Sequence, residues 1–140
     1  MARCRRCPKC AYVLLGMAAF LPTAADELNA DDAILALENL PTFRQMIGSN
    51  EHTPFECIGE PDEARLMFHL LFRRGQYPTL EATLSHACGA PDRATLDRLL
   101  EVDATAHGIP AKYATRILGV LQDGANTARE RIAAELGGHA

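Results

Sequence analysis

The 140-residue chain contains no tryptophan and shows almost no pattern typical of β-strands. No six-residue stretch alternates apolar and polar residues with enrichment in β-branched side chains, and no Asn-Gly or Asp-Gly turn joins two such stretches. With 48% hydrophobic residues the chain has enough apolar material for a core, and its length allows one domain at most. The absence of strand patterns favours a helical fold.

Signatures of common catalytic sites are also missing. No serine lies in a G-x-S-x-G elbow, no glycine-rich loop follows a strand, and no H-E-x-x-H sequence occurs. None of the histidines pairs with another histidine, a cysteine or an acid at a recognised metal-ligand spacing. The sequence therefore predicts no catalytic residue, no metal site and no cofactor. The histidines in question are His52, His69, His86, His107 and His139.

Helical periodicity is present through most of the chain. Apolar residues recur at intervals of three and four, and prolines and glycines lie at the ends of these stretches. The pattern predicts an all-α fold, either a small orthogonal helical bundle or stacked helical hairpins, with five to six helices. Gly119 and Gly124 weaken the middle of the last helix, where a break is possible. The predicted helices cover about residues 29–39, 42–47, 61–74, 79–88, 91–108 and 110–136.

Residues 1–25 have the three parts of a secretory signal peptide. A basic cluster precedes an apolar run of 11 residues from Ala11 to Leu21, and the small residues Ala24 and Ala25 follow Pro22. The run is shorter than the roughly 20 apolar residues that span a bilayer. We therefore expect cleavage near Ala25, a single helical domain over residues 26–140, and a periplasmic or secreted protein.

The same segment allows a second interpretation. Cys4, Cys7 and Cys10 form a C-x-x-C-x-x-C run, and closely spaced cysteines are typical of zinc and iron–sulfur sites. A zinc knuckle needs a fourth ligand nearby, and the next candidate, His52, lies far along the chain. A metal-binding protein that retains this run is therefore an alternative hypothesis.

Cleavage would leave an acidic domain with few possible polyanionic partners. Four of the 14 basic residues lie before residue 10, so residues 26–140 carry 10 basic and 18 acidic residues, a net charge of −8. Such a domain has little attraction for nucleic acid or an anionic membrane. We expect another protein as the partner, no nucleic acid, and no stable membrane insertion after cleavage; the oligomeric state stays open.

Two cysteines remain after residue 25, Cys57 and Cys88. An even number is typical of proteins in an oxidising compartment. Cys57 precedes the helix expected at 61–74 and Cys88 ends the helix expected at 79–88, so an antiparallel hairpin would bring them together. We predict a Cys57–Cys88 disulfide, worth roughly 3–4 kcal/mol on the chain-entropy model.

Charged residues of the 61–74 helix provide the only candidate binding site. Arg65, Arg73 and Arg74 lie on this helix, and the last two are placed to clamp a carboxylate or phosphate. The alternative is that they offset the dipole at the end of the helix. The acidic residues at the helix starts, Asp31 and Asp32 and Glu60, Asp62 and Glu63, lack calcium-loop spacing and are explained by capping.

The stretch from Ala106 to Ile117 resembles part of the helical chorismate mutases, some of which are exported. The likeness covers about a tenth of the chain. Where that family places a polar or acidic catalytic side chain, this chain has Ala125 and Arg129, and basic residues for two substrate carboxylates have no counterpart. The resemblance implies a small exported enzyme as an alternative function.

The lack of a catalytic constellation favours a non-enzymatic role. We therefore interpret the chain as an exported helical protein that binds another protein, as inhibitors, immunity factors, chaperones and envelope accessories do.

Overall fold

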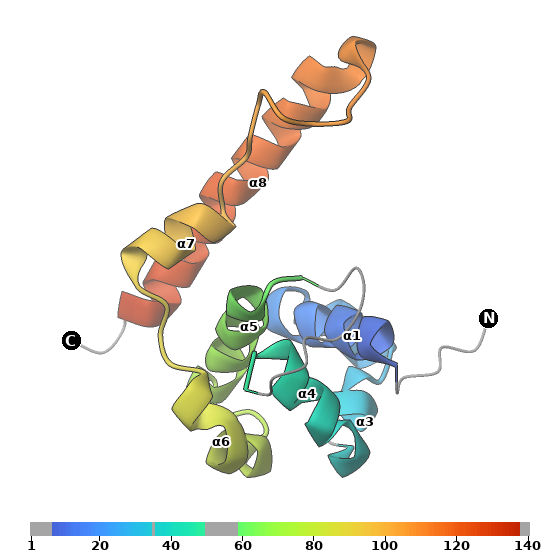
Figure 1. The fold of residues 1–140 in the computed structure, drawn as a ribbon, viewed down its shortest axis with the longest axis vertical. Helices are drawn as coiled ribbons and strands as arrows, with labels where there is room; N and C mark the ends of the chain where they lie inside the picture. The colour runs from blue at the N-terminus through green and yellow to red at the C-terminus, as the bar shows by residue number, and fades with distance from the viewer. Residues whose placement is uncertain (1–6, 35, 50–58, 138–140) are drawn as a thin grey trace. The chain divides into compact units, whose positions relative to one another are not determined.

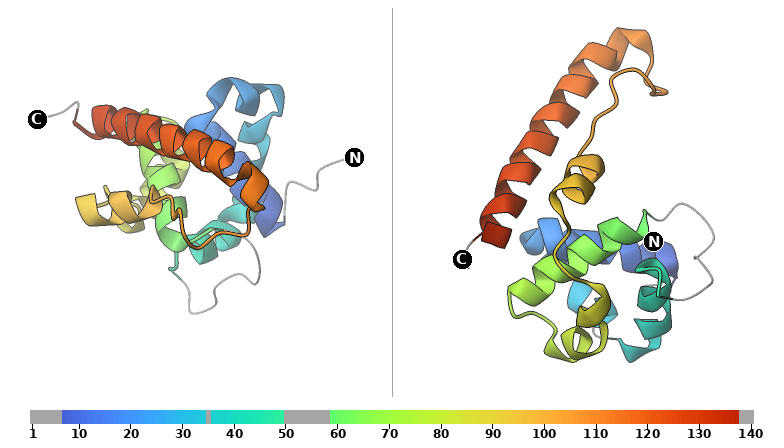
Figure 2. Two further views of the ribbon diagram at one scale, coloured as in Figure 1. Left: turned by 90° about the horizontal axis from the view of Figure 1, so that it is seen from above. Right: turned by 60° about the vertical axis from the view of Figure 1, so that its left-hand side comes forward.

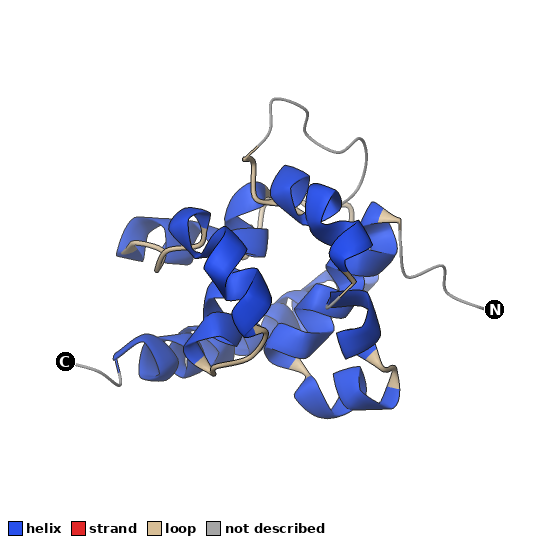
Figure 3. Ribbon diagram, turned by 90° about the horizontal axis from the view of Figure 1, so that it is seen from below, coloured by secondary structure: helices blue, strands red, loops and turns tan. Residues whose placement is uncertain are grey.

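The computed structural model describes residues 7–34, 36–49 and 59–137, and most of these are helical, as the sequence predicts. The regular elements of this described part are all helices, without a strand (Figure 3). They group into two compact units, unit 1 over Met1–Pro91 and unit 2 over Asp92–Ala140. The all-α prediction is confirmed. The expected single domain over residues 26–140 stays a prediction.

Unit 1 is arranged around its first helix. Helix α1 packs against α2, α3 and α5, and also contacts α4 (Figure 1). Short 3-10 turns follow α3 and α6. The elements of unit 1 are α1 (Pro8–Phe20), α2 (Pro22–Glu27), α3 (Ala30–Ile34), η1 (Leu37–Asn39), α4 (Leu40–Met46), α5 (Pro61–Arg73), α6 (Pro78–Leu84) and η2 (Ser85–Ala87).

The core of unit 1 contains a chain of aromatic contacts. The Phe68 ring of α5 meets Phe43 of α4 edge-on at 5.2 Å between centroids, and stacks with Phe72 at 5.7 Å. Both arrangements are favourable for aromatic pairs. Phe43 and Phe68 are fully buried, so these rings fix α4 against α5.

Helix α1 is part of this core, so the expected cleavage near Ala25 would remove part of the core. One face of α1 is buried, and the opposite face leaves Val13 and Phe20 exposed. A helix that covers the core and the apolar part of a signal sequence have the same residue composition, because both need an unbroken apolar run. The buried residues of α1 are Ala11, Leu14, Leu15, Ala18 and Ala19.

Helices α5 and α6 are joined by a tight turn at Gly75 and Tyr77, both of which have left-handed backbone angles. The returning segment brings η2 beside α5, as the predicted hairpin requires. Cys88 at its end is a buried free thiol, and Cys57 lies outside the described residues. The Cys57–Cys88 disulfide is therefore not confirmed.

Unit 2 consists of α7 (Arg93–Leu99), a connecting segment and the long α8 (Ala111–Gly137). The expected helix over 91–108 ends early, because the Asp103 carboxylate accepts hydrogen bonds from the backbone N–H groups of Thr105 and Ala106. Such local bonds compete with helix continuation. Helix α8 runs unbroken through Gly119 and Gly124, so the possible break there does not occur (Figure 2).

Among the described residues, no helix is both long enough and apolar enough to cross a bilayer.

Candidate functional site

The N-terminal end of α5 joins polar groups of α1 and α5. Tyr12 of α1 donates its hydroxyl proton to Glu63 at 2.7 Å, across 51 residues of sequence. The same carboxylate oxygen accepts the backbone N–H of Glu60 at 2.8 Å and completes a capping box. Glu63 therefore caps α5 and holds α1 against it, which extends the capping role predicted from the sequence.

This arrangement keeps Tyr12 protonated well above neutral pH. Burial raises the pKa of Tyr12, and the hydrogen bond and negative charge of Glu63 raise it further. A phenol with a raised pKa keeps its proton at neutral pH, so it does not act as a general base there. The Tyr12–Glu63 pair is therefore suited to holding two helices together.

A second tyrosine repeats this pattern just after the C-terminal end of α5. The hydroxyl of Tyr77 donates to the Asp31 carboxylate of α3, and burial, then this hydrogen bond, raises the pKa of Tyr77. Tyr77 is buried and has φ of 56°, a left-handed conformation that a bulky residue adopts only when its surroundings hold it. Asp31 lies in the first turn of α3, as the sequence predicts.

Arg65, the first of the three predicted binding residues, is engaged within unit 1. Its Nε donates to the carbonyl oxygen of Ile47 at 2.9 Å, and its Nη1 donates to Asp62 at 3.0 Å. The Nη2 atom also lies near Gly48, where a Cβ would approach it at 3.3 Å and where φ is 69°. Arg65 thus ties the end of α4 to the start of α5.

Arg74 and Arg73 lie at the other end of α5, and both are exposed. Arg74 donates to the carbonyl oxygen of Ala19 at 2.8 Å, and so helps to satisfy the C-terminal end of α1. At about 100° per residue, Arg65 and Arg74 leave opposite sides of α5. The structure therefore does not bring the three arginines together in one site.

Cys88 and His69 form a further contact in unit 1. The Nδ1 atom of His69 lies 3.0 Å from the backbone carbonyl oxygen of Cys88. Burial raises the pKa of the Cys88 thiol to about 11, so the thiol stays protonated near neutral pH. Within the described residues no three histidines, cysteines or acids lie close enough to hold a metal ion, and Cys4 lies outside this part.

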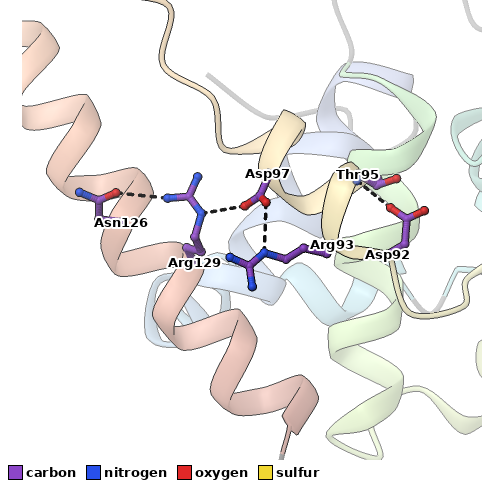
Figure 4. Close-up of polar contacts among 6 residues, drawn as sticks. All are labelled: Asp92, Arg93, Thr95, Asp97, Asn126 and Arg129. Atoms are coloured by element: carbon purple, nitrogen blue, oxygen red, sulfur yellow. Dashed lines mark hydrogen bonds and ion pairs between the residues drawn. The ribbon is translucent and has the colours of Figure 1, made fainter.

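Unit 2 has a separate set of polar contacts between α7 and α8. The Asp97 carboxylate of α7 binds Arg93 at 3.1 Å and Arg129 of α8 at 3.2 Å, and Arg129 also donates to Asn126 (Figure 4). Asp92 caps α7 by accepting the N–H of Thr95 at 2.7 Å. These contacts attach α7 to the second half of α8.

Sequence reasoning missed the two tyrosine–carboxylate pairs. Tyr12 lay in the segment interpreted as a leader, and Tyr77 has no neighbour in sequence that would indicate its partner 46 residues away. The sequence indicated only the positions of the acidic partners, since Glu63 and Asp31 both lie in the first turn of a helix.

Comparison with known proteins identifies relatives of unit 1. Residues 1–96 match the MurL C-terminal domain family. The chain is similar to UDP-N-acetyl-alpha-D-muramoyl-L-alanyl-L-glutamate epimerases, with 30% identity over 115 residues to that of Micromonospora sp., covering 79% of the chain and 26% of the relative. The epimerase of Salinispora tropica is 38% identical over 69 residues, covering 49% of the chain and 15% of the relative. That of Xanthomonas oryzae pv. oryzae is 29% identical over 75 residues, or 53% of the chain and 17% of the relative.

The chain thus spans about a quarter of the length of the Micromonospora epimerase, and less of the other two. No solved structure matches it significantly.

These matches correct the predicted function and localisation. The relatives are enzymes, so the prediction of a non-enzymatic exported binding protein is wrong. The chorismate-mutase-like and metal-binding alternatives are not supported either, since the relatives are epimerases. A periplasmic or secreted location is wrong as well, because the names of the relatives specify a UDP-linked substrate and the match includes the expected leader. The match over residues 1–96 shows that the chain belongs to the MurL C-terminal domain family.

Proposed function

We propose that this chain acts as the C-terminal part of an epimerase that inverts the L-glutamate residue of UDP-N-acetylmuramoyl-L-alanyl-L-glutamate. The observation that carries the proposal is the family match over residues 1–96, which takes in all of unit 1. The 30% identity over 115 residues to an epimerase supports it, and 26% coverage of that relative means that most of the enzyme lies in other sequence.

Inversion at the α-carbon of glutamate requires removal of a proton and its return on the opposite face. The step that removes the proton needs a base. Tyr12, Tyr77 and Cys88 have raised pKa values and keep their protons near neutral pH. Glu63 and Asp31 already accept the tyrosine hydrogens. These contacts support a role in building and holding the domain, and we assign no proton-transfer residue to this chain.

The substrate carries a diphosphate and carboxylates, so its binding favours exposed cations. Arg73 and Arg74 are exposed at the C-terminal end of α5, whereas Arg65 is half-buried and donates to the carbonyl oxygen of Ile47. The exposed pair is therefore the proposed substrate contact among the three arginines. In the assembled enzyme, Arg73→Ala should raise KM with little change in kcat, whereas Arg65→Ala should lower the stability of unit 1.

A chimeric enzyme tests the proposed function. The segment of the Micromonospora epimerase that this chain matches is replaced by this chain, and the product is hydrolysed and analysed for D-glutamate by chiral chromatography. In D2O the inverted residue should also carry deuterium at its α-carbon. We expect the chimera to be active and the same relative without the segment to be inactive.

The chimera also has a clear negative outcome. Circular dichroism and thermal unfolding report whether the replaced segment is folded. A folded chimera that forms no D-glutamate, under conditions in which the unmodified relative does, would contradict the proposal.

A further inference from the structure

The first half of α8 has an apolar face that is left exposed. Tyr113, Ile117, Val120 and Leu121 are 40–67% exposed, although their spacing places them on one side of the helix. Helix α7 is attached to the other half of α8, through the Asp97–Arg129 contact. We call these four residues and Gly124, which continues the same face, the α8 stripe.

We propose that the α8 stripe binds the α8 stripe of a second copy of this chain, in an antiparallel two-fold pair. In a two-fold contact, each residue faces a residue of the partner and the reverse contact also occurs. One register places Tyr113 opposite the partner's Gly124 and Ile117 opposite the partner's Val120. This inference goes beyond the proposed function and does not depend on it.

The sizes of the facing residues suit this register. A glycine in the middle of a helix weakens it relative to alanine. A Cβ at Gly124 would meet nothing within 4 Å, so packing within the chain does not require this glycine. Opposite a second α8, the missing side chain leaves space for a Tyr113 ring, and by symmetry this happens twice.

Charges beside the stripe are complementary in the same register. Arg116 and Asp123 are exposed and lie on the same border of the stripe, about 100–120° round the helix from Ile117. In an antiparallel pair the same borders of the two helices meet. The partner's Asp123 then lies about 3 Å along the axis from Arg116, close enough for an ion pair. Two such pairs form across the interface.

This self-complementarity favours a second copy over other occupants. A different protein segment on the stripe would need neither a glycine opposite Tyr113 nor opposite charges on one border. The contact involves only part of one helix, so we expect a dimer that dissociates on dilution.

Sedimentation equilibrium of the full chain at increasing concentration tests the proposal. The mass should rise from 15.2 kDa toward twice that value. Gly124→Leu should prevent dimerisation, although it favours the helix of the monomer, because the new side chain occupies the space for Tyr113. Thr115→Asp, on the far side of α8, should leave the dimer unchanged and is the matched control.

A charge reversal tests the register and the partner together. Asp123→Arg alone should weaken dimerisation about tenfold, and the double variant Arg116→Asp/Asp123→Arg should restore it. Circular dichroism verifies that α8 is intact in each variant. A chain that stays monomeric at every concentration, a dimer that tolerates Gly124→Leu, or a double variant as weak as the single one would each overturn the proposal.

Discussion

Unit 1 and unit 2 are both helical, but they bury very different amounts of apolar surface. Unit 1 has one continuous cluster that includes residues from α1, α3, α4, α5 and α6. In unit 2, the buried hydrophobic residues among those described are Leu96 and Ile132. The family match ends at residue 96, close to the boundary between the units.

The difference shows that helical periodicity by itself does not specify a core. The apolar residues of α5 and of the first half of α8 recur at the same spacing, yet those of α5 are buried and those of α8 are exposed. Isolated helices are only marginally stable in water, so most of their stability comes from packing of the apolar face. Unit 2 should therefore be the less stable unit.

Removal of residues 1–25 should have the largest effect on this contrast. The deletion takes away α1 and the five residues that α1 buries, so we expect unit 1 to lose its fold. Backbone NMR spectra should lose the dispersed signals of residues 59–91. A deletion of residues 1–6 alone is the control, and it should leave those signals in place. A folded chain that starts at Asp26 would show that α1 is dispensable, as a cleaved leader would be.

Phe68→Ala should have the next largest effect. Phe68 is fully buried and contacts two other rings, so its truncation should lower the free energy of unfolding of unit 1 by about 3–5 kcal/mol. Urea denaturation monitored residue by residue separates the two units. The amides of α8 should keep their own transition, and a shift of that transition by the same amount would show that the two units unfold together.

The positions of α4 to α6 follow closely from the sequence. Expected helices at 42–47, 61–74 and 79–88 correspond to α4, α5 and α6 with η2, because prolines and glycines fix their ends. Residues 8–27, most of which the sequence assigns to a leader, form α1 and α2 in the structure. An apolar run after a basic cluster has the same composition whether it enters a membrane or a core, and only the tertiary partners distinguish the two.

The site was harder to predict than the fold. Arg65 and Arg74 carry the charge that a binding site needs, yet they donate to the backbone carbonyl oxygens of Ile47 and Ala19. Sequence position on a helix gives the direction of a side chain but not its long-range partner. Tyr12 and Glu63, 51 residues apart, illustrate the same limit.

Tyr12→Phe should have a moderate effect that depends on pH. Loss of the hydrogen bond to Glu63 should lower the stability of unit 1 by about 1 kcal/mol near neutral pH. Burial and Glu63 raise the pKa of Tyr12 in the folded state, whereas the unfolded chain releases this proton near pH 10. The unfolded state therefore binds fewer protons above pH 10, and stability falls as the pH rises.

Urea midpoints measured between pH 8 and pH 11 test this linkage, and Tyr12→Phe should make the decline less steep. Tyr77→Phe should do the same, because the pKa of Tyr77 is also raised. Tyr113→Phe, at an exposed position in unit 2, is the control. If the urea midpoints of Tyr12→Phe and Tyr77→Phe fell with pH as steeply as those of the unchanged chain, neither hydroxyl would make the hydrogen bond that the structure shows.

The smallest effect is expected at Asp97, where two arginines act on one carboxylate. The hydrogen bond from Arg93 lowers the pKa of Asp97 most, and Arg129 lowers it further. NMR titration of the Asp97 carboxyl should show a larger rise in its pKa for Arg93→Ala than for Arg129→Ala.

Only Arg129→Ala should loosen α7 from α8, because Arg93 and Asp97 belong to the same helix. Since a lowered pKa contributes stability that is lost as the pH falls through it, the Arg129 variant should also reduce the acid sensitivity of the α7–α8 contact. If Arg129→Ala left hydrogen exchange in α7 unchanged, apolar packing of Leu96 and Ile132 would be sufficient to hold α7 against α8. The two units would then differ only in the amount of apolar surface that they bury.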